Sequence, residues 1–417
     1  MAIAATGPPL LAYGCGRSYG DVALNPGGRL LDCRALDRFI AFDHDTGVLT
    51  CEAGVTLAEI LKVVCRPDAD GGGWFLPVSP GTRFVTVGGA IANDVHGKNH
   101  HLFGTFGEHV LSLEIARTGG RVVCDRLSNA ELLRATIGGL GLTGIILAAT
   151  IQLRRVPGFG VESEEIQFNS LADFFQLARE SEIAWEYTAA WIDCLARGRA
   201  LGRGVFSRAR HRPGLAAEPP DEEQGASPPE PPLSFANGLT LPIFNALYWR
   251  KLGLRSHVQS SGGYQGVLYP LDTIAGWNRL YGPHGFYQFQ SVTPPDSADA
   301  LHELLTVISE SGQGSMLTVL KSFAKRPAAG MLSFPMEGFT LALDFPNQGE
   351  RTRSLLARLE TIVVQAGGRL YPAKDSLMSA ASFRRGYPQL ETFLPHIDQR
   401  LSSAFARRVG IHHSETT

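Results

Sequence analysis

The chain has 417 residues, of which 44% are hydrophobic and 19% are charged, and its formal net charge is −2. This length allows two domains that each bury a core, and the near-neutral charge excludes a broad basic surface for nucleic acid. The sequence has no stretch of about 18 uncharged apolar residues, so it offers no candidate membrane-spanning helix.

The N-terminal segment MAIAATGPPLLAYG has no basic residues, and Gly7, Pro8 and Pro9 interrupt its apolar run. It is therefore a poor signal peptide. The six cysteines contain no CxxC pair, and we expect free thiols in a reducing compartment. Together these features favour a cytoplasmic protein with at most peripheral membrane contact.

The first glycine-rich turn, YGCGRSYGD, spans Tyr13 to Asp21. Its glycines are spaced GxGxxxG, one residue away from the dinucleotide-binding fingerprint. The turn can present backbone N–H groups to a pyrophosphate, with Arg17 or Ser18 assisting, or it can be a plain surface turn. The residues of this turn alone favour neither reading.

Two elements follow the turn before the central stretch. A strand is expected at Arg29 to Asp32. Residues 48–54, VLTCEAG, alternate as a second strand, and Thr56 is a candidate N-cap for a helix that follows.

The central stretch, residues 77–110, is dense in glycines and hydrogen-bonding side chains. The glycines are Gly81, Gly88, Gly89, Gly97, Gly104 and Gly107. The polar residues between them are Thr82, Thr86, Asn93, Asp94, His96, Lys98 and Asn99. Glycines let backbone approach a flat or charged group closely, and the apolar runs between them are expected to be too short for helices. We interpret this stretch as backbone wrapped around a flavin.

The same stretch contains four histidines, at positions 96, 100, 101 and 109. A zinc site usually needs ligands from one helix face or from paired cysteine knuckles. No cysteine lies nearby, and Gly97 interrupts any helix that could align the histidines. We expect no metal site.

Strands at Leu111 to Ala116 and Arg121 to Cys124 flank a turn at Gly119-Gly120, and a helix is expected at Ala130 to Thr136. Gly139, Gly141 and Gly144 then match GxGxxG. This motif follows a helix and opens into a β-branched strand, which is the reverse of the Rossmann order. A nicotinamide site is therefore not expected. We place the end of the first domain near Pro157.

The second half alternates amphipathic helices with apolar strands, which predicts an α+β domain with one covered sheet. The expected helices are Leu171 to Ser181, Asp296 to Ser311 and Arg351 to Gln365. The expected strands are Trp185 to Ile192, Met316 to Leu320 and Phe339 to Phe345. The Pro- and Glu-rich segment near 212–233 predicts a mobile loop, either a lid or a plain insertion. Phe235 to Trp249 can be core or a hydrophobic docking surface.

Polar residues of the second half can line a pocket. They are Gln288 and Gln290 on one strand face, Lys321 at the end of an apolar strand, and Tyr371 and Lys374 in a polar turn. A lysine that closes an apolar strand is often only a solvated strand end. With glutamines and a tyrosine near it, the same lysine can line a polar binding site.

Four motifs together resemble a known family. They are YGCGRSYGD, PGTRFVTVGGAIANDVHGKNHH, GGLGLTGII and GGRLYPAKDS. The sequence resembles the vanillyl-alcohol-oxidase-type FAD enzymes, and the resemblance covers nearly the whole chain. It implies an α+β fold: a two-subdomain PCMH-type FAD-binding domain over 1–156, a substrate domain with a mainly antiparallel sheet over 157–370, and a segment 371–417 that returns to the flavin.

The resemblance also implies roles for individual residues. FAD would be held by Tyr13, Gly14, Gly16, Arg17, Ser18, Tyr19, Gly20, Gly81, Thr86, Val87, Gly88, Gly89, Asn93, His96, Ile146 and Tyr371. Substrate would contact Tyr19, Gln288, Gln290, Lys321, Ala342 and Lys374. Lys374 is the first candidate for the hydroxyl proton, with His96 second and Tyr371 beside the flavin. Relatives with covalent FAD carry a histidine where Arg17 stands, so the resemblance implies non-covalent FAD.

The implied reaction is oxidation of a secondary hydroxyl of a sugar to a ketone. Within the family the chain is most similar to enzymes that oxidise the 2′-hydroxyl of a polyprenylphosphoryl-β-D-ribose. That reaction is the first half of a 2′-epimerisation in cell wall arabinan biosynthesis, completed by an NAD(P)H-dependent reductase. A soluble aminosugar, nucleoside or alditol is the alternative substrate, and a silent binding module is a third reading. The pocket cysteine of these enzymes is Ala342 here, and the N-terminal segment is short.

Overall fold

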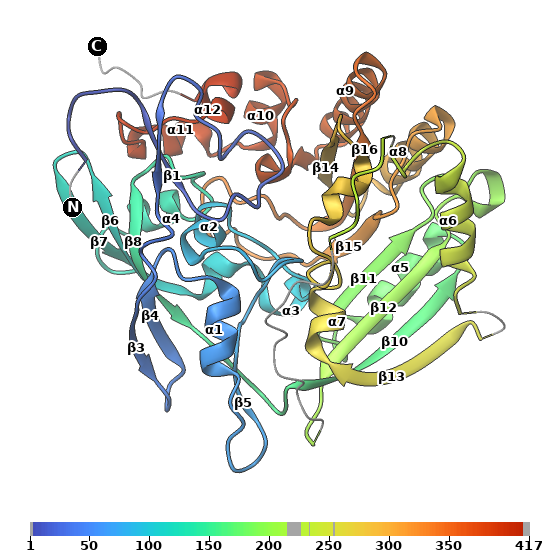
Figure 1. The fold of residues 1–417 in the computed structure, drawn as a ribbon, viewed down its shortest axis with the longest axis horizontal. Helices are drawn as coiled ribbons and strands as arrows, with labels where there is room; N and C mark the ends of the chain where they lie inside the picture. Colours follow the sequence, from blue (N-terminus) through green and yellow to red (C-terminus); the bar gives the residue numbers. More distant parts are fainter. Residues whose placement is uncertain (1–2, 215–226, 233, 253–254, 412–417) are drawn as a thin grey trace.

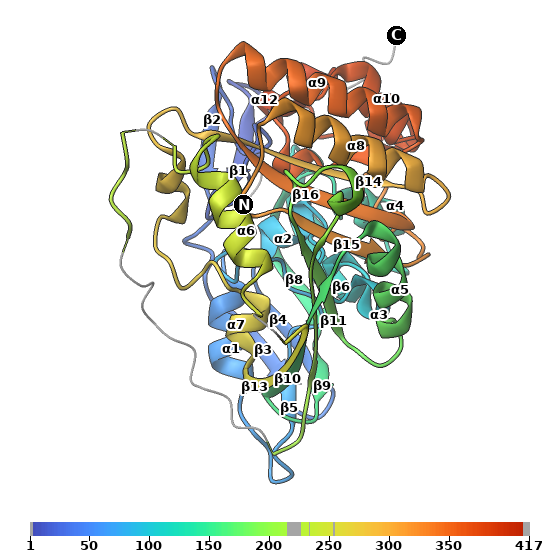
Figure 2. The ribbon, with the colours of Figure 1, turned by 90° about the vertical axis from the view of Figure 1, so that its right-hand side faces the viewer.

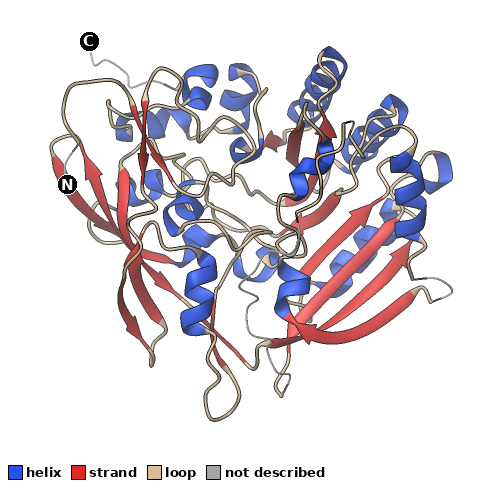
Figure 3. Ribbon diagram, viewed as in Figure 1, coloured by secondary structure: helices blue, strands red, loops and turns tan. Residues whose placement is uncertain are grey.

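The computed structural model describes residues 3–214, 227–232, 234–252 and 255–411. Two antiparallel sheets lie on opposite sides of the molecule in Figure 1, with loops and short helices between them. Figure 3 shows the same two sheets in red. Part of the loop predicted near 212–233 falls on 215–226 and 233, outside the described residues.

The N-terminal sheet has the strand order β3-β4-β8-β6-β7. Its strands are β3 (Phe39–Asp43), β4 (Val48–Glu52), β6 (Val110–Arg117), β7 (Gly120–Asp125) and β8 (Ile145–Gln152). Around it lie the pairs β1 (Leu10–Tyr13) with β2 (Arg29–Asp32) and β5 (Gly73–Phe75) with β9 (Arg154–Val156). Helices α1 (Leu57–Val64), α2 (Val87–Ala92), α3 (His100–Phe103) and α4 (Ala130–Thr136) complete this part.

The large sheet has the order β13-β10-β12-β11-β15-β16-β14-β17 within the described residues. The strands are β10 (Gly160–Phe168), β11 (Tyr187–Ile192), β12 (Gly204–His211), β13 (His257–Gly263), β14 (Phe286–Thr293), β15 (Val319–Phe323), β16 (Gly338–Pro346) and β17 (Arg369–Leu370). One face packs against α5 (Leu171–Ser181), α8 (Ala298–Ser311) and α9 (Glu350–Gln365), which lie together in Figure 2. Helices α6 (Thr240–Trp249) and α7 (Tyr264–Leu268) complete this half.

The C-terminal segment crosses back to the start of the chain. It contains α10 (Ala380–Gly386), α11 (Leu390–Phe393) and α12 (Ala404–Val409). The N–H of Leu10 donates to the carbonyl of Arg400 at 2.7 Å, and Arg408 forms an ion pair with Asp21 at 2.7 Å. These contacts hold the first glycine-rich turn, which follows β1, against the end of the chain.

Several predicted elements are confirmed because their signals are local. The α1 helix begins after Thr56, whose hydroxyl accepts from the N–H of Glu59 while the Glu59 carboxylate accepts from the N–H of Thr56. This reciprocal capping box satisfies two donors that the first helical turn would otherwise leave unpaired. The helices predicted at 130–136 and 171–181 begin and end as expected.

Two predictions need correction. The central stretch contains the short helices α2 and α3, although its apolar runs were expected to be too short for helices. Gly88 permits α2, because a Cβ there would lie 3.1 Å from the Cβ of Ala53. The strand predicted at 316–320 lies at 319–323 instead, since the indole of Trp191 binds the carbonyl of Met316 and Ser315 caps a turn before the strand.

The described helices include none that is long and apolar enough to cross a membrane.

Candidate active site

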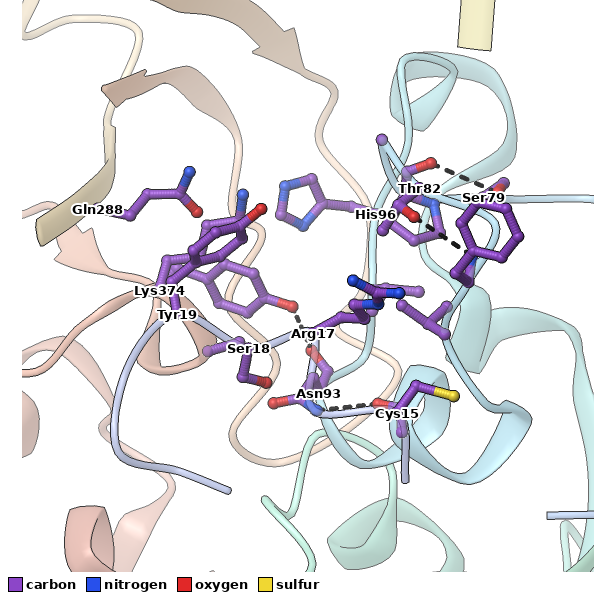
Figure 4. Close-up of a pocket in the computed structure, with 18 of the residues that line it drawn as sticks. Cys15, Arg17, Ser18, Tyr19, Ser79, Thr82, Asn93, His96, Gln288 and Lys374 are labelled. Atoms are coloured by element: carbon purple, nitrogen blue, oxygen red, sulfur yellow. Dashed lines mark hydrogen bonds between the residues drawn. The ribbon is translucent and has the colours of Figure 1, made fainter. Parts of the chain in front are cut away.

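A cavity of about 680 Å³ lies between the two sheets. Both halves of the chain contribute to its wall, and Figure 4 shows side chains from the first glycine-rich turn, the central stretch and the large sheet pointing into it. This volume is typical of a site for a small molecule or cofactor. The cavity therefore brings together segments that are far apart in the sequence.

The first glycine-rich turn forms one edge of the cavity. The N–H of Tyr19 donates to the carbonyl of Ala373 at 2.9 Å, and a Cβ on Gly20 would collide with the carbonyl oxygen of Asp375. A Cβ on Gly14 would lie 2.5 Å from the hydroxyl of Thr86. The turn therefore lies so close to both α2 and the C-terminal segment that neither position leaves room for a side chain.

The central stretch forms the next part of the wall around α2. Thr86 caps the helix by accepting from the N–H of Gly89 at 3.1 Å. The amide nitrogen of Asn93 donates to the carbonyl of Gly89, while the buried amide oxygen of Asn93 has no partner. The hydroxyl of Tyr371 donates to the carbonyl of Asn93 at 2.9 Å. An unpaired oxygen in a cavity wall is costly unless a ligand completes its hydrogen bonds.

The large sheet forms the opposite wall with alternate residues of four adjacent strands. Residues two apart in a strand share a face. The pairs that line the cavity are Ala189 and Trp191 on β11, Val319 and Lys321 on β15, Ala342 and Asp344 on β16, and Gln288 and Gln290 on β14. Intervening residues such as Leu320, Leu343 and Phe289 belong to the core on the helix-covered face. One face of this sheet is therefore a polar binding surface.

The strand register pairs these polar side chains with one another. Gln288 lies opposite Asp344, and its amide nitrogen donates to the Asp344 carboxylate at 2.5 Å. The amide nitrogen of Gln290 lies 2.9 Å from Nε2 of His96 and 3.0 Å from the hydroxyl of Thr340. With Gln290 donating, Nε2 of His96 is an acceptor and the unpartnered Nδ1 carries the proton.

Three lysines line the cavity, and burial lowers the pKa of each. The pKa of Lys321 falls to about 7, because burial and the charges of Lys374 and Lys98 disfavour its ammonium form. Burial brings the pKa of Lys98 to about 8. The pKa of Lys374 is also lowered by burial, but the carboxylate of Asp344 opposes that shift. Lys321 and Lys98 can therefore exchange protons near neutral pH.

Asp344 and His96 are both buried in low-dielectric surroundings, which shift the pKa of each side chain. Burial raises the pKa of Asp344 to about 6, although the hydrogen bond from Gln288 acts in the opposite direction. The ring of His96 lies 4.9 Å from Phe323, 5.5 Å from Phe334 and 5.3 Å from Tyr371, centre to centre. Burial there lowers the pKa of His96 well below its usual value, so its imidazole is neutral at pH 7.

The other histidines of the central stretch have structural roles. Nε2 of His101 bonds the carbonyl of Trp185, and Nε2 of His109 bonds the carbonyl of Phe103, each at 2.8 Å. Burial lowers the pKa of His100 to about 3. Across the described parts of the chain, no group of three metal-ligating side chains comes together.

Most of the residues that the sequence nominated line the cavity. They are Tyr13, Gly14, Gly16, Arg17, Ser18, Tyr19, Gly81, Thr86, Gly88, Gly89, Asn93, His96, Ile146, Gln288, Gln290, Lys321, Ala342, Tyr371 and Lys374. Two nominated residues lie outside the wall. Val87 is fully buried in the N-terminal hydrophobic core, and Gly20 packs against Asp375 instead.

Sequence reasoning missed several residues of the wall. Asp344, Trp191, Tyr248 and Trp277 also line the cavity. For Asp344 a signal was present, because TLALDF places Ala342 and Asp344 two residues apart on one strand face. No local pattern marks Tyr248 or Trp277, which reach the cavity from segments whose positions depend on the tertiary fold.

Comparisons with known proteins identify the cofactor class. Residues 1–125 match the FAD binding domain family. The chain is 36% identical over 401 residues to decaprenylphosphoryl-β-D-ribose oxidase of Mycolicibacterium smegmatis, covering 93% of this chain and 85% of that protein. An uncharacterised Streptomyces coelicolor protein is 33% identical over 81% of this chain and 96% of its own length. L-Gulonolactone oxidase of Bos taurus is 30% identical over 36% of this chain.

The cavity fits the cofactor that these comparisons indicate. Its wall includes Gly81, where a Cβ would meet no protein atom within 4 Å, and Gly141, where the nearest atom would lie 3.8 Å away. The buried amide oxygen of Asn93 and Nδ1 of His96 are unpaired at the same wall. A dinucleotide lying along this surface would use the open backbone and complete these hydrogen bonds. The chain belongs to the family of FAD-dependent oxidoreductases that includes decaprenylphosphoryl-β-D-ribose oxidase.

Proposed function

We propose that this protein oxidises a secondary hydroxyl of a sugar to a ketone, and that the substrate is the 2′-hydroxyl of a polyprenylphosphoryl-β-D-ribose. The reaction would be the first half of a 2′-epimerisation. The observation that carries the proposal is the convergence of Lys321, Lys374, Gln288 and Gln290 on one cavity that also holds the glycine-rich wall. The similarity to the Mycolicibacterium smegmatis oxidase over 93% of the chain supports the substrate class.

The N-terminal half would hold FAD without a covalent bond. The first glycine-rich turn and the residues around α2 would bind the dinucleotide, with Ile146 on its adenine side and Tyr371 beside the ring system. Bound FAD supplies the acceptor for the hydride that leaves the sugar carbon. Tyr371 is held for this role by its hydrogen bond to Asn93. By the family resemblance, Arg17 would stand where relatives with covalent FAD carry a histidine, and an arginine side chain would form no such bond.

Lys374 would accept the proton of the substrate hydroxyl. Its amine lies 5.2 Å from the centre of the Tyr19 ring, at the wall where the polar side chains of the large sheet converge. Burial lowers the pKa of Lys374, which makes the neutral amine available as a base. His96 is the second candidate and lines the same wall, but its Nε2 already accepts from Gln290 and burial disfavours its charged form, which ranks it below Lys374.

Lys321 and the glutamines would bind and orient the sugar phosphate. A phosphodiester carries one negative charge, and the ammonium of Lys321 would neutralise it in a site from which water is largely excluded. Gln288 and Gln290 are fixed by Asp344 and His96, so their orientation does not depend on substrate. Such pre-organised groups hold the C–H bond in a reactive geometry.

We further propose that an NAD(P)H-dependent reductase takes the keto product and restores the opposite epimer. We divide the chain functionally into a FAD-binding domain over 1–156, a substrate domain over 157–370 and a C-terminal segment over 371–417. The six cysteines are free thiols, which suits a cytoplasmic enzyme.

A product assay tests the proposal. The purified holoenzyme would be incubated with farnesylphosphoryl-β-D-ribofuranose, with the corresponding sugar phosphate, and with a panel of aminosugars, nucleosides and alditols. We expect a ketone product, lighter by two hydrogens, from the lipid-linked ribose alone. A ketone formed only from a soluble sugar would replace the proposed substrate with the alternative class. Holoenzyme that oxidises none of these compounds would contradict the proposed reaction.

A further inference from the structure

The outer face of α6 carries an exposed apolar stripe. Leu239, Ile243 and Leu247 recur every four residues and are 73%, 54% and 66% exposed. Phe235, just before the helix, is 48% exposed. We call these four residues the α6 stripe. Side chains four residues apart share one face of a helix, and an exposed apolar face of this kind marks a binding surface.

The helix that carries the stripe is held firmly on its other face. Leu241 and Asn245 are buried, and the amide of Asn245 donates to the carboxylate of Asp193 at 2.8 Å. The ring of Tyr248 lies 4.6 Å from that of Trp191, centre to centre. These contacts fix which face of α6 is turned outward, so the exposure of the stripe follows from the packing of the helix.

Residues next to the α6 stripe reach the cavity at both ends of the helix. At the C-terminal end, Tyr248 and Trp191 both line the cavity, and Phe244 stacks on Tyr248 at 5.7 Å. At the N-terminal end, the N–H of Phe235 donates to the carbonyl of Leu280 at 2.9 Å. Leu280 belongs to the short 3-10 helix Trp277–Tyr281, whose Trp277 lines the cavity. The cavity therefore reaches the inner side of α6, and the stripe occupies the outer side of the same helix.

The cavity itself separates charge from apolar surface. Gln288, Gln290, Lys321 and Lys374 gather on β14, β15 and the turn at 372–374. Leu317, Leu271 and Ile274 add apolar lining, and Ile274 is 40% exposed. A ligand with an anionic head at the lysines and an apolar tail would match this division, with the tail leaving past Tyr248.

We propose that the α6 stripe binds isoprene units of the polyprenyl chain of the substrate after the chain has passed Tyr248 and left the cavity. This inference rests on the proposed function, and it names α6 as the element that distinguishes lipid-linked from soluble sugars. The α6 stripe would cover part of the chain that otherwise contacts water. Burial of apolar surface would then contribute to substrate affinity while leaving the chemical step unchanged.

The test compares two substrates that share one phosphodiester head. Farnesylphosphoryl-β-D-ribofuranose carries an isoprenoid chain, and methylphosphoryl-β-D-ribofuranose carries a methyl group in its place. In the double variant Ile243→Ser/Leu247→Ser we expect KM for the farnesyl substrate to rise about tenfold with kcat unchanged. The methyl substrate does not reach the stripe, so its KM should stay constant. The matched control is Val123→Ser/Leu127→Ser, two exposed apolar residues in and just after β7.

Three results would overturn the inference. They are an unchanged KM for the farnesyl substrate, an equal loss for both substrates, or a loss seen only when substrate is presented in phosphatidylcholine vesicles. The last would indicate that α6 docks on a membrane and does not hold the chain. Binding of farnesyl phosphate, followed by tryptophan fluorescence, separates this inference from the proposed function. Weaker binding in the α6 variant would support the stripe even if no ribose compound were oxidised, and equal binding would refute it.

Discussion

Asp344 on β16 and Gln288 on β14 face each other across the cavity side of the large sheet, and the Gln288 amide donates to the Asp344 carboxylate at 2.5 Å. The carboxylate also raises the pKa of Lys374 against the effect of burial. Asp344 therefore has two effects: it orients a substrate-binding amide, and it sets the charge of the proposed base.

The variant Asp344→Asn tests this second effect. Removing the negative charge disfavours the ammonium form, so the pKa of Lys374 should fall. The rising limb of the pH profile for flavin reduction should move to lower pH by about one unit, while the hydrogen bond from Gln288 is kept. Ala342→Ser, on the same strand face, is the neutral control. A limb that stays in place in Asp344→Asn would show that Asp344 does not set the charge of Lys374.

Replacing Lys374 by alanine should leave FAD bound but slow its reduction by substrate about a hundredfold or more, because the acceptor for the hydroxyl proton is lost. Lys374→Arg should be nearly as slow, since arginine keeps the charge and does not act as a base at neutral pH. Flavin content and the rate of flavin reduction are both measured by absorbance. A wild-type rate in Lys374→Ala would remove Lys374 from the mechanism.

The lowered pKa of Lys321 predicts that substrate binding depends on pH. Its pKa is about 7 in the protein, so it is an ammonium below that pH and a neutral amine above it. A phosphodiester keeps its charge over this range, and the Kd of a non-reactive 2′-deoxy substrate analogue should therefore rise as pH increases through about 7. The variant Lys321→Gln should bind more weakly, with this dependence lost. The same pH dependence in Lys321→Gln would assign it to another group.

A substitution at Gly81 tests where the cofactor lies. A Cβ at Gly81 would meet no protein atom within 4 Å, and Gly81 lines the cavity. The variant Gly81→Ala should therefore fold with an unchanged Tm of the apoprotein but bind FAD about tenfold more weakly. Gly266→Ala, which also meets no atom and lies in α7 away from the cavity wall, is the control. Equal FAD affinity in both variants would place the cofactor elsewhere.

The flavin should be released by acid precipitation, because no histidine stands at position 17 to form the bond found in covalent relatives. Absorbance of the supernatant and of the pellet measures the partition. Yellow colour that remains with the precipitated protein would contradict a non-covalent cofactor.

Much of the fold could be predicted from the sequence because its signals are local. The α4 and α5 helices follow from apolar spacing, and α5 follows also from Ser170, whose hydroxyl caps its first turn. The α2 helix could not be predicted in this way. It contains two adjacent glycines, and it forms where the tertiary structure brings Gly88 against Ala53. Contacts distant in sequence decide such a helix, and propensity alone argues against it.

The site could be predicted only in part for a similar reason. Glycine clusters and lysines near apolar strands stand out in a sequence, and most of the nominated residues line the cavity. The alternation in β16 shows that Ala342 and Asp344 share a face, but only the packing of α8 and α9 decides that this face is the open one. Trp191 and Tyr248 meet across elements that are far apart in the chain.

The most direct test of the proposed function is anaerobic bleaching of the bound flavin by farnesylphosphoryl-β-D-ribofuranose. Without oxygen, the loss of flavin absorbance reports hydride transfer alone and needs no knowledge of the natural electron acceptor. We expect rapid bleaching by this compound and none by the same molecule with a 2′-deoxyribose. Bleaching by both compounds would contradict oxidation at the 2′-hydroxyl, and persistent yellow colour with the intact substrate would contradict the proposed reaction itself.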